Sequence, residues 1–169
     1  SVAYSFVNAL VQEEKHEDAV TLLESLVDMN PNDAQLRSVY GTELFILTTE
    51  ISNDLKAAYR QQDTSLTAQL RFELEGNGEL AENNLVAAYQ LDKENADNVE
   101  SLAVFYNNLS AEYLELAEVA FNDDKSGMRT KAMALGNFAL NYYEELLGMK
   151  PEDDAVKQKV ETLRRLFQK

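Results

Sequence analysis

The sequence predicts an all-α fold in which antiparallel helical hairpins, about seven helices in all, stack into one array. Apolar residues recur every three or four positions along almost the whole chain, and no segment alternates as a strand does. Only 2 Pro and 6 Gly are present, too few for a turn-rich β fold. The 169 residues, 45% of them hydrophobic, suit a single domain over 1–169 with its own core.

The first hairpin is predicted over residues 1–31. A first short apolar stripe stops at the polar segment 12–17, and its members are Val2, Phe6, Val7, Leu10 and Val11. A second stripe runs from Ala19 to Val27, and Pro31 closes it because proline cannot continue a helix.

The second hairpin is predicted over residues 32–93 and has longer helices. A stripe from Leu36 to Tyr59 predicts one helix of about 26 residues. Residues 63–65 supply cap side chains for a return helix that reaches Tyr89. The sequence Gly-Asn-Gly at 76–78 destabilises this helix, since each Gly makes helix formation about 1 kcal/mol less favourable than Ala does. The apolar phase continues across it, which favours one kinked helix over the alternative, a break into two.

The third hairpin is predicted over residues 94–151, and a last helix over 152–169. The fifth stripe runs from Val99 to Phe121 and is expected to end in a loop at 122–127, before a sixth stripe that reaches Pro151. The last helix has acids at its start and bases at its end, including Lys169, which complements the helix dipole. Its apolar positions are Val156, Val160, Leu163 and Phe167.

An internal repeat links the second helix of each hairpin. Four positions recur at identical spacings, as Ala19, Leu23, Leu26 and Pro31, then Ala81, Leu85, Ala88 and Lys93, then Ala139, Tyr143, Leu146 and Pro151. This pattern resembles the second helix of the tetratricopeptide repeat, in which A-x3-F is followed by Pro eight residues later. The segment 99–106 is similar to the first helix of that family with Val in place of Trp, 40–44 partly so, and 6–10 weakly.

The resemblance implies a tetratricopeptide-like superhelix with elongated helices. Ala81 follows Ala19 by 62 residues and Ala139 follows Ala81 by 58, where the family repeats about every 34. Longer helices account for the difference. The alternative is a conventional repeat hidden inside the second hairpin, since 76–81 also resembles the family's interhelical turn. The last helix then looks like the helix that caps such arrays.

The resemblance also implies a concave groove, lined by the first helix of each hairpin, that receives a peptide. The peptide-binding positions expected from it are Tyr4, Asn8, Ser38, Thr42, Phe45, Glu100, Val104, Asn107 and Asn108. Asn side chains can bond a peptide backbone, and aromatic rings can hold apolar side chains. None of these positions is basic, which disfavours the clamp for C-terminal carboxylates that some family members use.

Charge narrows the class of partner. The chain has 15 Lys and Arg against 30 Asp and Glu, a net charge of -15. Residues 73–124 carry thirteen acids and one base, whereas 155–169 carry five bases and one acid. Such a chain repels phosphate backbones and anionic lipid heads, so we expect a basic or apolar protein or peptide partner and no nucleic acid. No apolar run is long enough to cross a membrane and no signal pattern appears, which predicts a soluble protein, with cytoplasm and periplasm both open.

The sequence contains few residues that could form a catalytic or metal-binding site. There is no Cys, and the single His, His16, is expected to be a solvated turn residue. Residues 122–127 begin like an EF-hand loop, but Met133 occupies the position of its bidentate Glu, so a turn with solvated acids is expected.

Two carboxylate pairs, Glu13 with Glu17 and Glu75 with Glu79, are each expected on one solvated helix face. No catalytic residue, cofactor or metal site is therefore predicted.

These observations predict a non-catalytic interaction or scaffold module that binds a basic or apolar peptide in its groove. The alternative is a self-associating structural segment of a larger cell-envelope protein, and hence a homo-oligomer. An enzyme of unknown type is the third hypothesis, for which no catalytic constellation is present.

Overall fold

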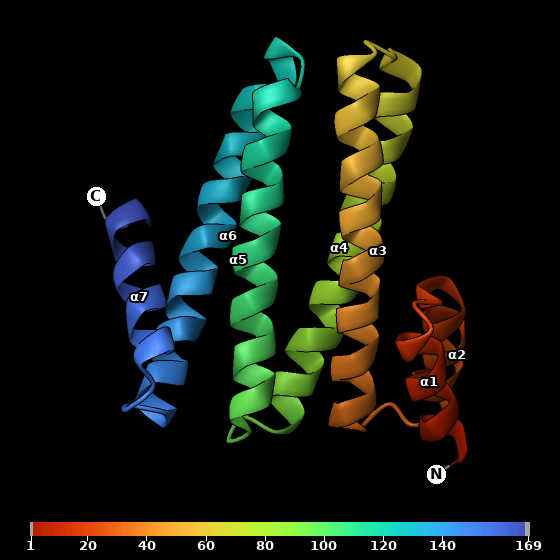
Figure 1. The fold of residues 1–169 in the computed structure, drawn as a ribbon, viewed down its shortest axis with the longest axis vertical. Coiled ribbons are helices and arrows are strands. Elements are labelled where there is room, and N and C mark those ends of the chain that lie inside the picture. Colours follow the sequence, from red (N-terminus) through yellow and green to blue (C-terminus); the bar gives the residue numbers. More distant parts are fainter. Residues whose placement is uncertain (1, 168–169) are drawn as a thin grey trace.

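The computed structural model describes residues 2–167, and within them the chain forms seven helices and no strand, which confirms the predicted all-α hairpin array. Each helix packs on the next, and α3 also packs on α5 (Figure 1). The helices are α1 (Val2–Gln12), α2 (His16–Met29), α3 (Ala34–Arg60), α4 (Thr64–Leu91), α5 (Ala96–Val119), α6 (Asn122–Met149) and α7 (Asp154–Phe167).

Side-chain caps mark the beginnings of α3, α4 and α5, whereas α2 and α6 begin without one. The carboxylates of Asp33 and Asp63 accept the backbone N–H of Leu36 and Leu66 at 3.0 and 2.9 Å. The Asn95 side chain does the same for Asp97 at 3.0 Å. Such caps contribute about 0.5–2 kcal/mol each, so these residues define where α3, α4 and α5 begin.

Small residues allow the paired helices to approach closely. The three Ala at the aligned repeat positions, Ala19, Ala81 and Ala139, are fully buried. Opposite Ala81, Gly41 of α3 has no room for a side chain, since a Cβ there would lie 2.6 Å from Cγ of Leu85. The repeated Ala therefore marks a crossing of helices in the second hairpin.

Helix α4 is continuous through residues 76–78, so the alternative of a break is wrong. No Gly there adopts a positive φ. Gly78 is buried and faces Thr48 of α3, while Gly76 has open space around it. Figure 1 shows the second half of α4 leaving α3 and moving toward the beginning of α5, in keeping with its packing on both helices.

The prediction of a loop at 122–127 is wrong, because these residues form the first turns of α6. The chain reverses instead at Phe121, which is extended and packs edge-on against the Tyr59 ring at 4.9 Å. The acids are not all solvated either, since Asp124 is bound by the Tyr59 hydroxyl at 2.9 Å and by Arg71 at 2.7 Å. Contacts with the preceding hairpin thus override the polar composition of this segment.

Burial was overestimated at the N-terminal end. Val2 is 89% and Phe6 59% exposed, although both belong to the first apolar stripe. The reason is that α1 packs only on α2 among the described helices. Its buried residues are Val7 and Leu10.

Helix α7 covers the other end of the array. Val156, Val160 and Leu163 are buried against α6, and the Phe167 ring occupies the space that a side chain at Gly136 would need. The helix was predicted to run to 169, and residues 168–169, with Lys169, lie outside the described part of the chain.

Candidate functional site

An open groove lies between α3 and α5 at the end of the array that carries the α2–α3 and α4–α5 turns. Its polar cleft has a volume of about 870 Å³, and its apolar pocket about 330 Å³. The polar cleft is lined by Asn30, Pro31, Asn32, Asp33, Ala34, Gln35, Ser38, Val39, Asp92, Asn95, Asp97 and Asn98. The apolar pocket is lined by Thr42, Phe45, Leu85, Asp97, Glu100, Ser101, Val104 and Phe105.

Helical spacing brings these side chains to one face. Ser38, Thr42 and Phe45 follow one another at four and three residues along α3, which places them side by side. Asp97, Ser101 and Val104 repeat that spacing on α5.

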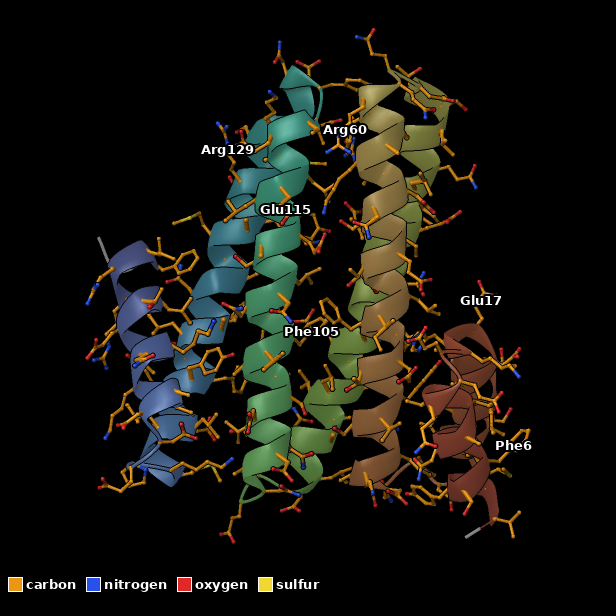
Figure 2. All side chains as sticks on the ribbon, viewed as in Figure 1. Phe6, Glu17, Arg60, Phe105, Glu115 and Arg129 are labelled. Atoms are coloured by element: carbon orange, nitrogen blue, oxygen red, sulfur yellow. The ribbon has the colours of Figure 1, made fainter. Side chains whose placement is uncertain are left out.

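The floor of the apolar pocket is aromatic. The Phe45 and Phe105 rings meet edge-on with centroids 5.3 Å apart. Phe105 is 2% exposed, and Figure 2 shows it on α5 in the space facing α3. Leu85 of α4 closes the bottom, so all three helices build the pocket.

Five of the nine predicted peptide-binding residues line this groove: Ser38, Thr42, Phe45, Glu100 and Val104. Phe45 is half-buried, while Val104 is 38% exposed. The Thr42 hydroxyl donates to the Ser38 carbonyl at 2.9 Å. Glu100 accepts a hydrogen bond from the Lys150 ammonium at 3.1 Å, which brings a base to the rim that the predicted positions themselves lack.

Tyr4 and Asn8 lie on α1 and do not line the groove. The Tyr4 hydroxyl donates to Asp33 at 2.9 Å, which ties α1 to the turn between α2 and α3. Burial, with the hydrogen bond and charge of Asp33, raises the pKa of Tyr4 to about 12. Asn8 is exposed.

Asn107 and Asn108 continue along α5 beyond the groove lining. The Asn107 amide donates to the Asn108 side-chain oxygen at 3.1 Å. The four residues outside the groove were predicted by extending one pattern over all first helices, whereas this cleft forms only where α3 and α5 face each other.

Sequence reasoning missed Leu85, Asp97, Ser101 and Phe105. Asp97 and Ser101 could have been found from helical spacing, since they lie three residues before the predicted Glu100 and Val104, and Phe105 lies one turn after Ser101. Leu85 comes from a second helix, which the family pattern excludes from the groove. The turn residues of the polar cleft carried no signal, because turns 31–33 and 92–95 meet only in the folded chain.

The groove is acidic. Its lining contains Asp33, Asp92, Asp97 and Glu100, and none of its lining residues is Lys, Arg or His. Asp97 lines both the polar cleft and the apolar pocket, and among the described residues no base lies within salt-bridge distance of its carboxylate. The groove can therefore attract a cation next to an apolar surface.

His16 is not the solvated turn residue that was predicted. Its Nδ1 lies 2.7 Å from Oε2 of Glu43, and the two side chains are 18% and 4% exposed. Glu43 of α3 faces α2 and needs a polar partner once buried. This pair therefore belongs to the junction of the first two hairpins.

The prediction that Glu13 and Glu17 share one helix face is also wrong. Helix α1 ends at Gln12 and α2 begins at His16, so the two acids belong to different segments. Glu13 instead lies 2.6 Å from the Lys15 ammonium. Glu75 and Glu79, on α4, are both exposed.

Within residues 2–167, no three His, Asp or Glu side chains are grouped so as to hold a metal ion. None of the helices described is both long and apolar enough to cross a bilayer.

No family model matches this chain and no curated protein matches it, so the likeness to the tetratricopeptide repeat rests on its own residues and their spacing.

Proposed function

We propose that this chain is a non-catalytic protein-interaction module that binds a basic or apolar peptide segment in the groove between α3 and α5. The observation that carries the proposal is the combination of an aromatic floor with an acidic rim in one groove. Cavities of about 300–1,000 Å³ are typical of ligand sites.

The two parts of the groove offer a peptide different interactions. The side chains of Asn32 and Gln35 are exposed in the polar cleft and can both donate to and accept from a peptide backbone. Burial of one large apolar side chain over Phe45 and Val104 contributes about 1.5–3 kcal/mol. A module of this kind binds with modest affinity unless several such contacts combine.

The hydroxyls of the apolar pocket favour binding over catalysis. Ser101 donates to the Asp97 carbonyl at 2.8 Å, and Thr42 donates to its own helix in the same way. Within the described residues, neither hydroxyl is hydrogen-bonded to a carboxylate or imidazole, as an activated nucleophile needs.

Selection of random dodecapeptides displayed on phage against the whole chain tests the proposal. Val104→Glu puts a charge into the apolar pocket and is expected to weaken the selected peptides at least about tenfold, which corresponds to about 1.4 kcal/mol. Leu114→Glu is the matched control, since Leu114 is 42% exposed on the same helix and outside the groove. Peptides that bind both variants equally well would contradict the proposal.

Self-association is a second candidate, favoured by α1. This helix has no charged residue, and it exposes Val2 and Phe6 one turn apart. Light scattering over a concentration series would show oligomers that disappear in Phe6→Asn. A mass that stays monomeric at every concentration would exclude this candidate.

A further inference from the structure

Asp97 lines both compartments of the groove. It is in the first turn of α5, where its side chain is exposed. The same residue forms part of the wall of the polar cleft and of the apolar pocket. A ligand atom that contacts this carboxylate is therefore next to both compartments.

Two of the other three acids of the groove are already engaged, and the third, Asp92, lines the polar cleft but not the apolar pocket. Asp33 caps α3 and accepts the Tyr4 hydroxyl, and Glu100 accepts the Lys150 ammonium at 3.1 Å. In the described part of the chain no ion pair or side-chain hydrogen bond engages the Asp97 carboxylate, and the Lys150 ammonium, which is bound to Glu100, acts on it only by charge at longer range. The contact of Lys150 with Glu100 shows that this rim accepts a lysine ammonium.

We propose that the groove recognises a two-part element, a Lys or Arg that pairs with Asp97 beside a large aliphatic or aromatic side chain in the apolar pocket. The inference rests on the proposed function and adds that both features are required in one ligand, next to each other or nearly so. The apolar side chain supplies most of the affinity, and the base selects among apolar segments.

The contact between the base of the ligand and Asp97 is solvent-exposed, which limits its contribution to the binding free energy. Exposed ion pairs contribute about 0.2–1 kcal/mol, so loss of the base should weaken binding up to about fivefold. Because the Debye length falls from about 10 Å at 0.1 M salt to about 3 Å at 1 M, this difference should fade with added salt.

A double-mutant cycle on the peptides selected above tests the inference. In each peptide the base is replaced by Gln, and binding is measured to the parent chain, to Asp97→Asn and to Asp18→Asn. Asp18 is the matched control, an exposed acid in the first turn of α2 and away from the groove. We expect the Gln peptide to lose up to about fivefold on the parent and on Asp18→Asn, and nothing on Asp97→Asn.

The outcomes separate this inference from the proposed function. If the selected peptides lack a base but their binding is weakened by Val104→Glu, the two-part element is wrong and the proposed groove still stands. An equal loss from the Gln peptide on Asp97→Asn would also overturn it, because the base would then pair elsewhere. Peptides insensitive to Val104→Glu would contradict the groove itself.

Discussion

The junction between the second and third hairpins has two halves of opposite chemistry. The aromatic half, beside the groove, consists of Phe45, Tyr89, Phe105, Tyr106, Phe138 and Tyr142. The charged half, toward the α3–α4 turn, consists of Ser52, Lys56, Tyr59, Arg71, Glu112, Glu115 and Asp124. Figure 2 shows Phe105 and Glu115 on α5 in these two halves.

The aromatic half joins the hairpins by ring contacts. The Tyr142 ring of the third hairpin meets the Tyr89 ring of the second edge-on at 5.5 Å, and within the third hairpin it stacks on Tyr106 with centroids 5.7 Å apart. The hydroxyls of Tyr106 and Tyr89 reach the carboxylates of Glu82 and Glu145, at 2.6 and 3.0 Å. Because aromatic rings bury a large apolar area, we expect this half to contribute more stability than the charged half.

The charged half joins the hairpins through a nearly buried lysine. Lys56 is 7% exposed, and its ammonium lies 2.7 Å from the Glu112 carboxylate, which also accepts the Ser52 hydroxyl at 2.6 Å. Burial alone would lower the pKa of Lys56, but hydrogen bonds to Glu112 and Glu115 outweigh burial and raise it. The cost of desolvating both charges offsets much of their attraction, so we expect this half to contribute little net stability.

The largest effect is expected from Phe105→Ala. Removing a fully buried ring that contacts Phe45 and Tyr106 should cost about 3–5 kcal/mol in the free energy of unfolding. Urea unfolding followed by circular dichroism measures it, with Leu114→Ala as the exposed control. A loss below about 1 kcal/mol would show that the aromatic half does not dominate.

A smaller loss, about 2–3 kcal/mol, is expected for Lys56→Met, because it leaves the Glu112 carboxylate without its cation. The side chain of Glu112 is 17% exposed, which keeps the loss at or below the range for fully buried pairs. The double variant Lys56→Met, Glu112→Leu should recover most of the stability in the same unfolding assay. A double variant that is less stable than Lys56→Met would show that the charged half contributes net stability.

Alkaline pH acts on both halves. Burial and hydrogen bonds to Asp124 and Glu82 raise the pKa of Tyr59 and Tyr106. The folded chain therefore holds these protons more tightly, and stability is full below about pH 10, where unfolded tyrosine titrates, and falls as pH rises above it.

Tyr59→Phe should flatten that fall by up to about 1.4 kcal/mol per pH unit, and Tyr106→Phe should do the same for the aromatic half. Chemical denaturation between pH 8 and pH 11, a range set about the ordinary tyrosine pKa of ~10, measures the slopes. Unchanged slopes in both variants would contradict the role given to these hydroxyls.

The smallest effect is expected from Arg164→Gln on α7. Its guanidinium lies 2.8 Å from Glu144, but the two side chains are 53% and 32% exposed. Loss of an exposed pair should cost at most about 1 kcal/mol and less at high salt. Thermal melts at low and high salt compare the stability loss of Arg164→Gln with that of Lys56→Met. If the two losses were equal, the exposed ion pair and the buried ion pair would not differ in their contribution to stability.

Local patterns were enough to predict most of the helices. Periodic apolar residues predicted α1 to α7, and a cap residue at Asp63 placed the start of α4. They failed at 122–127, where Phe121 and Asp124 are held by the preceding hairpin. The same limit applies to the groove, since only part of it was predicted.

The sequence by itself determined that this chain forms helical hairpins, because helix period and caps act over a few neighbouring residues. Only the tertiary structure decided which polar groups are paired. His16 with Glu43 and Lys56 with Glu112 join residues 27 and 56 positions apart. It also decided that Asp97, Phe45 and Leu85 border one groove, because the packing of α3, α4 and α5 sets those distances and no local pattern encodes it.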